Sequence, residues 1–179
     1  DSNTATITII FGDAVEIIID NATGKPGETV TTGVTLKNHP NISGGYLYIK
    51  YDPAGLTFQD GQITAGEWES GTVEEPDTPG TILMELSGSP GALPANEEET
   101  RLGELNFGIK DDASGEYDLT FSETGLYDDN NEVISTVNTD GKITVDANTA
   151  AEIEIESCIQ RADDTGYIDI KFIGKDAEN

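Results

Sequence analysis

Positive charge is scarce in this chain of 179 residues. Lys and Arg number 9 against 35 Asp and Glu, which gives a net charge of −26 at pH 7. A surface this acidic repels phosphate backbones and anionic lipids, so nucleic acids and membrane surfaces are poor partners. Long apolar runs are also missing, and none approaches the roughly 20 residues that span a bilayer. We therefore expect no membrane insertion, and the acidity is typical of an extracellular protein.

Cysteine and histidine occur once each. Cys158 has no partner for an intramolecular disulfide, and we expect a small packed side chain at the end of a strand. His39 stands before Pro40 in a turn, where a lone histidine is more often structural than catalytic. The acidic run 128–132 resembles the start of a calcium loop but lacks the EF-hand glycine, so a solvated hairpin tip is favoured. No nucleophile elbow, metal-binding helix or phosphate loop occurs, and we predict no enzyme activity, catalytic residue, metal site or cofactor.

The pattern of a long amphipathic helix is absent. Short alternating segments between turns rich in Gly and Pro instead predict an all-β sandwich or barrel. We expect one short helical turn, at 96–100. The predicted strands cover residues 7–11, 15–19, 29–36, 46–51, 81–87, 103–109, 117–121 and 141–145.

Two further alternating runs, 152–159 and 167–173, predict an extra C-terminal β-hairpin. A two-stranded hairpin is marginally stable alone in water, so we expect this one to pack on the sandwich or to begin a following module. The chain accordingly divides into a sandwich, residues 1–146, and a hairpin extension, residues 147–179. The apolar residues of the hairpin are Ile153, Ile155, Ile168, Ile170 and Phe172.

The segment GGYLYIKYDPAGLTF, residues 44–58, carries large apolar groups on both faces of one predicted strand. Because side chains alternate along a strand, Leu47, Ile49 and Tyr51 share the face that fills a core. The other face presents two tyrosines. It would leave aromatic area in water unless a second molecule docks there, or unless loops or the C-terminal hairpin of the same chain cover it.

The outward tyrosines, Tyr46 and Tyr48, gain neighbours if the strands at 81–87 and 116–121 lie beside them. Leu83 would then extend an apolar centre, and Glu85, Glu116 and Asp118 would form a charged rim around it. This is the anatomy of a protein interface. We assign these candidate partner-binding residues: Gly44, Tyr46, Tyr48, Lys50, Leu83, Glu85, Glu116, Asp118 and Val133.

Two other interpretations of the aromatic residues remain open. A carbohydrate-binding β-sandwich would use Tyr46, Tyr48 and Trp68 as a stacking platform for sugar rings. A purely structural module of a surface protein would leave the aromatic face covered.

Four segments occur in an order that resembles the cohesin module of bacterial cellulosome scaffoldins: KPGETVTTGVTLKN, GGYLYIKYDPAGLTF, TRLGELNFGIKDDASGEYDLTF and DGKITV. The resemblance covers about residues 15–145. It implies a nine-stranded jelly-roll β-sandwich whose first strand starts at Val15 and whose last is DGKITV. It further implies a secreted or cell-surface module, a monomer by itself, that binds a dockerin domain and so helps to assemble a multi-enzyme complex degrading plant cell walls.

The resemblance also implies where the partner lies. In cohesins the dockerin, which carries its own calcium, lies across the sheet that here holds the strands 44–51, 81–87 and 117–121. A fourth strand of that sheet is expected between Gln62 and Ser70.

The aromatic strand departs from the pattern of type I cohesins. Those carry Asn and Asp at the start of this strand, where the present chain has Gly44 and Tyr46. At these positions the chain is more similar to the divergent type III cohesins, and an aromatic recognition pattern replaces the polar one.

Overall fold

The computed structural model describes residues 14–76, 79–146, 152–160 and 168–175. Every helix or strand assigned in these ranges is a β-strand, and they hold no helix long and apolar enough to cross a membrane. The chain forms two compact units, residues 1–146 and 147–179. The strand predicted at 7–11 lies outside the described residues.

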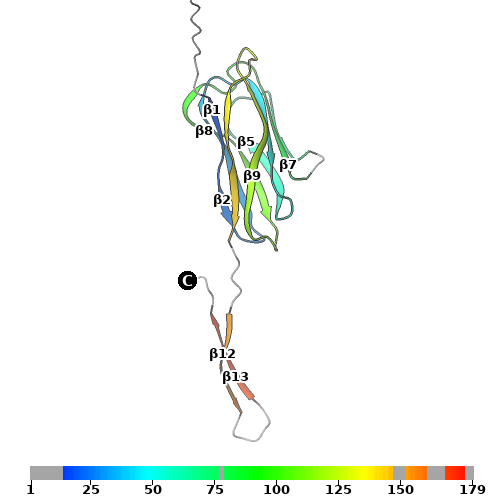
Figure 1. Ribbon diagram of the computed structural model, residues 1–179, viewed down its shortest axis with the longest axis vertical. Coiled ribbons are helices and arrows are strands. Elements are labelled where there is room, and N and C mark those ends of the chain that lie inside the picture. The colour runs from blue at the N-terminus through cyan, green and yellow to red at the C-terminus, as the bar shows by residue number, and fades with distance from the viewer. Residues whose placement is uncertain (1–13, 77–78, 147–151, 161–167, 176–179) are drawn as a thin grey trace, which may run out of the picture. The chain divides into compact units, whose positions relative to one another are not determined.

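The first unit is a sandwich of two sheets (Figure 1). One sheet consists of β1 (Val15–Ile19), β3 (Thr29–His39), β5 (Leu56–Ile63), β8 (Asn96–Ile109) and β10 (Thr136–Thr139). The other consists of β2 (Ala22–Gly24), β4 (Gly44–Lys50), β6 (Ser70–Glu74), β7 (Thr81–Ser87), β9 (Gly115–Tyr127) and β11 (Gly141–Val145). The five-stranded sheet has the order β10-β1-β3-β8-β5, and the six-stranded sheet has the order β2-β11-β9-β4-β7-β6.

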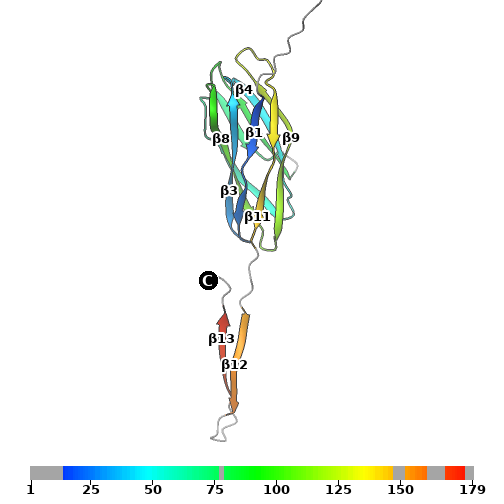
Figure 2. The same cartoon turned by 60° about the vertical axis from the view of Figure 1, so that its left-hand side comes forward.

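Two strands are interrupted and pass from one sheet to the other. Asp20 and Asn21 separate β1 from β2, and Asp140 separates β10 from β11. β1 pairs in parallel with β10, and β2 pairs in parallel with β11. β1 also pairs with β3, beside which it lies in Figure 2. Counting each interrupted strand once gives the nine strands of the predicted jelly roll, so the predicted fold class is confirmed.

The core between the sheets is filled by the alternating residues that the sequence pattern assigns to it. Leu47, Ile49 and Tyr51 are at most 7% exposed, and Ile82 and Met84 are fully buried. Because side chains alternate along a strand, these residues determine which face of β4 and of β7 points outward. The outward face of β4 is the one that carries the two tyrosines.

One wrong prediction concerns residues 96–100, which form the start of β8 rather than a helical turn. His39 pairs with Asn96, and Leu36 pairs with Thr100, in an antiparallel ladder. β3 thus offers a pairing edge to this segment, and pairing with a neighbouring strand overrides weak local helix propensity.

A second wrong prediction is the strand expected between Gln62 and Ser70. The strand beside β7 is β6, which only begins at Ser70. In the residues before it, Gly66 has φ +93° and Trp68 donates its indole N–H to the carbonyl of Ala65 at 2.6 Å. A left-handed φ suits glycine because it has no Cβ, so the chain turns there between β5 of one sheet and β6 of the other.

The second unit contains the antiparallel strands β12 (Glu152–Gln160) and β13 (Ile168–Lys175), which confirms the predicted extra hairpin. Cys158 pairs with Ile170 within this ribbon and is exposed. The expected packed cysteine is therefore wrong, since a side chain in a two-stranded ribbon is not enclosed by its own sheet. That the hairpin packs on the sandwich or begins another module stays a prediction.

Candidate partner-binding surface

Strands β4, β7 and β9 are neighbours in the six-stranded sheet and bring side chains together on its outer face. Tyr46 pairs with Glu85 of β7, and Tyr48 pairs with Leu83 of β7 and Glu123 of β9. Directly opposed residues of neighbouring strands point to the same face. Five residues line an open hollow there, which we call the tyrosine hollow: Tyr46, Tyr48, Leu83, Glu85 and Glu123.

Tyr46 is held in place on three sides. Its ring meets that of Tyr48 edge to face, with centroids 5.9 Å apart and planes inclined at 66°. Its hydroxyl donates a hydrogen bond to Glu123 Oε1 at 3.0 Å, which raises the pKa of Tyr46 because the bond favours the protonated phenol. Its ring lies against the backbone of Gly125, where a Cβ would come 2.8 Å from Cε1. The ring is therefore oriented before any partner arrives, which lowers the entropic cost of binding.

A β-bulge in β9 puts Glu123 on this face. Phe121 pairs with Ile49 and Glu123 pairs with Tyr48, so Ser122 is the extra residue. Strict alternation from the inward Phe121 would turn Glu123 toward the core, and the bulge reverses this. Sequence reasoning missed Glu123 for that reason. The signal that could have found it is the glutamate itself, because an unpaired carboxylate at an inward position is too costly to bury.

Three of the predicted residues flank the tyrosine hollow. Gly44 and Lys50 are the two ends of β4, on the same face as the tyrosines. Val133 is 74% exposed and forms a bridge with Tyr127, which in turn pairs with Gly44. The structure therefore brings these residues to the outer side of the same sheet.

The structure does not bring Glu116 and Asp118 beside the tyrosines, so the predicted rim is wrong at these positions. Both lie on β9 beyond its pairing with β4, next to β11. Glu116 forms an ion pair with Lys142 of β11 at 2.7 Å. The carboxylates beside the tyrosines are instead those of Glu85 and Glu123. A role of Glu116 and Asp118 in binding stays a prediction.

The outer face of the five-stranded sheet has a different character. Its polar side chains bond to one another: Thr31 donates to Asn106 at 2.6 Å, and Arg101 forms ion pairs with Asp20 and Glu104. Groups that are satisfied within the chain have little to gain from a partner. The outward pair Tyr46 and Tyr48 therefore distinguishes the outer face of the six-stranded sheet from that of the five-stranded sheet.

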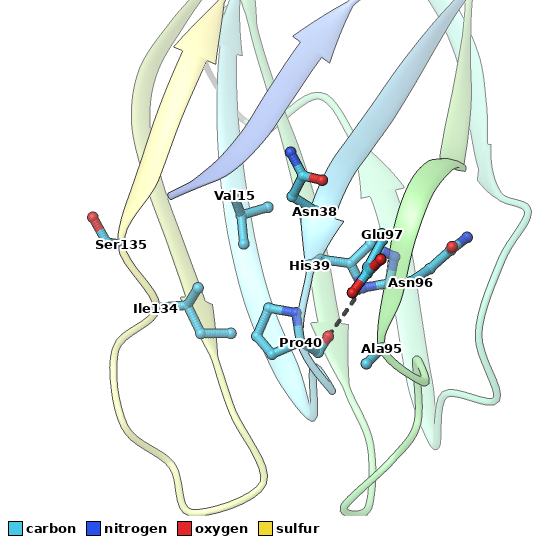
Figure 3. Close-up of a pocket in the computed structure, with 9 residues that line it drawn as sticks. All are labelled: Val15, Asn38, His39, Pro40, Ala95, Asn96, Glu97, Ile134 and Ser135. Carbon is cyan, nitrogen blue, oxygen red and sulfur yellow. Dashed lines mark hydrogen bonds between the residues drawn. The ribbon is translucent and has the colours of Figure 1, made fainter. Parts of the chain in front are cut away.

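A second hollow lies at one end of the sandwich, and Figure 3 shows nine residues that line it. His39 is 3% exposed there. Its Nδ1 donates to the carbonyl of Pro40 at 3.0 Å, drawn as a dashed line in Figure 3, and its Nε2 lies 2.9 Å from the hydroxyl of Thr100. Since both ring nitrogens have partners, His39 has the structural role that the sequence favoured.

The geometry does not support a sugar-stacking platform. Trp68 is partly buried against the core, and its indole N–H is bonded to the carbonyl of Ala65. The rings of Tyr46 and Tyr48 stand at 66° to each other. Two steeply inclined rings present no common plane on which a flat row of sugar rings could stack. The geometry therefore does not favour the carbohydrate-binding alternative.

Metal binding has no support in the part of the chain that the structure describes, where no group of three His, Cys, Asp or Glu side chains is placed to hold an ion. In the acidic tip, Asp128 Oδ1 accepts the backbone N–H groups of Asn130 and Glu132, both at 2.8 Å. Asp129 accepts the N–H of Gly91 at 2.6 Å. These carboxylates hold loops together through hydrogen bonds.

Residues 15–145 match the family model described as cohesin domain. No curated protein matches the chain.

Solved structures resemble the sandwich over about three quarters of this chain. The cohesin CaCohA2 of Clostridium acetobutylicum, in complex with a dockerin, is 25% identical, with a TM-score of 0.66 over 74% of this chain and 99% of that one. The sixth cohesin of scaffoldin B from Acetivibrio cellulolyticus, in complex with a Cel5 dockerin variant, is 19% identical, with a TM-score of 0.67 over 74% and 99%. A non-cellulosomal cohesin from the archaeon Archaeoglobus fulgidus is 15% identical, with a TM-score of 0.62 over 76% and 94%.

Proposed function

The chain belongs to the cohesin family, and from this premise we propose that it binds a dockerin module through the tyrosine hollow and the sheet around it. The observation that carries the proposal is the outward pair Tyr46 and Tyr48 beside Leu83, with polar residues around them. Apolar area in water is unfavourable unless a partner covers it. Aromatic side chains inside a polar rim are also where interfaces concentrate their binding free energy.

The proposed role is that of a non-catalytic adaptor. Two of the cohesins compared above were solved with dockerins, and one of these belongs to a scaffoldin. By analogy with them, this chain attaches a dockerin-bearing enzyme or scaffoldin to a larger extracellular assembly that degrades plant cell walls. It acts as a monomer and contributes neither a catalytic residue nor a metal ion, while the dockerin holds calcium. The assignment to type III stays a prediction.

Capture of the natural partner tests the proposal. The full chain is immobilised, and secreted proteins of the source organism are passed over it, once with calcium and once with a chelator. Proteins retained only with calcium are identified by mass spectrometry, and the dockerin among them is expressed alone for titration calorimetry. We expect a single class of dockerin to bind one to one. Retention on cellulose that is insensitive to the chelator, with no dockerin captured, would instead support the carbohydrate-binding alternative.

A further inference from the structure

The tyrosine hollow combines two kinds of group that attract positive charge. Its walls include the rings of Tyr46 and Tyr48, and its charged lining consists of two carboxylates, Glu85 and Glu123. An aromatic face attracts a cation through its quadrupole. A carboxylate adds Coulombic attraction and strong charge-assisted hydrogen bonds.

The two carboxylates are not neutralised within the described part of the chain. There the carboxylate of Glu85 makes no hydrogen bond or ion pair, and that of Glu123 accepts only the uncharged hydroxyl of Tyr46. Glu116 of the same sheet, by contrast, is paired with Lys142 at 2.7 Å. Negative charge is therefore available at the hollow and largely compensated at Glu116.

The net charge of −26 adds to this local field. An acidic side chain of a partner would be repelled from the hollow. A neutral apolar side chain would remove water from two carboxylates without replacing their hydrogen bonds, which is costly. Of the three kinds of side chain, a basic one is complementary to the hollow in both charge and hydrogen bonding.

We propose that the tyrosine hollow receives an arginine or lysine side chain of the partner, held by the rings of Tyr46 and Tyr48 and by the carboxylates of Glu85 and Glu123. The inference rests on the proposed function for the identity of the partner and adds the chemical class of the group that the partner presents. Glu123 then has two roles, since it orients Tyr46 and binds the cation.

A titration without any dockerin tests the inference. N-acetyl-arginine methylamide is the probe, and N-acetyl-citrulline methylamide is its uncharged isostere. Each is added to the full chain and followed by NMR. We expect saturable shifts at the amides of Tyr46, Tyr48 and Leu83, with roughly tenfold weaker binding of the citrulline compound. Equal affinities for the two compounds, or the absence of saturable shifts at these amides, would overturn the inference.

Matched variants separate the hollow from the general acidity of the chain. The E85Q/E123Q variant should lose the preference for the arginine compound. The control variant E97Q/E98Q also removes two exposed carboxylates, from β8 of the other sheet, and should keep the preference. If a captured dockerin binds E85Q/E123Q as tightly as it binds the parent chain, dockerin binding stands and the inference about the basic side chain fails.

Discussion

Tyr51 lies three residues after Tyr48 but points into the core. It is 7% exposed, and its ring meets that of Phe107 edge to face with centroids 5.3 Å apart. We expect Tyr51→Ala to lower the free energy of unfolding by about 3–5 kcal/mol, because it empties a large buried volume. Denaturant titration measures this loss. Tyr48→Ala, the same substitution on the outer face, should cost much less, and equal losses would contradict the assigned faces.

Asp128 makes the acidic tip sensitive to pH. The N–H groups of Glu132 and Asn130 favour the charged carboxylate and lower the pKa of Asp128 below its ordinary value of 3.8. Since the pKa is lower in the folded tip, the stabilisation is present above that ordinary value and is lost as the pH falls through the lowered pKa. NMR should show the amides of Asn130 and Glu132 titrating below pH 3.8, and Asp128→Asn should remove this step. A midpoint at or above the ordinary value would contradict the prediction.

Single residues could be assigned to a face from the sequence wherever the strands alternate regularly. Leu47 and Ile49 are buried, as the period of two predicts, and Tyr46 and Tyr48 are half-buried on the opposite face. The same rule fails at Glu123. The bulge that turns this residue outward depends on how two strands pair, so it cannot be predicted from the alternation of residues within one strand.

At the scale of elements, truncation of the hairpin β12–β13 tests whether it packs on the sandwich. If Ile153, Ile155, Ile168, Ile170 and Phe172 pack there, deleting residues 147–179 exposes apolar surface that they cover. The unfolding midpoint of the sandwich should then fall. Differential scanning calorimetry of the full and shortened chains measures this. An unchanged midpoint would show instead that the hairpin is independent of the core or belongs to the next module.

Two elements differ from the sequence-based expectation because their partners are distant in the chain. Residues 96–100 lack the alternating apolar pattern of a strand, yet the end of β3 supplies a pairing edge for them. The strand expected between Gln62 and Ser70 is instead β6, which begins at Ser70. Its position is determined by its pairing with β7. Strand formation depends on such context more than on local propensity.

For the whole molecule, the order of four sequence segments predicted the fold because their turns and alternating strands extend over residues 15–145. The identity of the dockerin cannot be predicted in the same way. Preference for one dockerin depends on the difference between the affinities for several dockerins, and the sequence of this chain alone contains no information about those dockerins.

The isolated chain should fold without calcium. The described residues hold no cluster placed to bind a metal ion. A chelator should therefore leave the melting temperature unchanged. It should abolish the complex with the dockerin if the dockerin holds calcium as proposed. Ionic strength must be matched in the melts, because any salt screens the self-repulsion of a chain with net charge −26. A fall of many degrees on chelation would contradict the prediction.

The proposed binding face is the outer face of β4. Titration calorimetry of Tyr46→Ala and Tyr48→Ala against the captured dockerin tests this assignment, with Glu116→Ala as the control and thermal melts to show that each variant is folded. Each tyrosine variant should lose about 2 kcal/mol or more of binding free energy, which is a roughly thirtyfold weaker complex, while Glu116→Ala should change the affinity far less. Tyrosine variants that fold normally and bind the dockerin with unchanged affinity would show that it binds elsewhere on the chain.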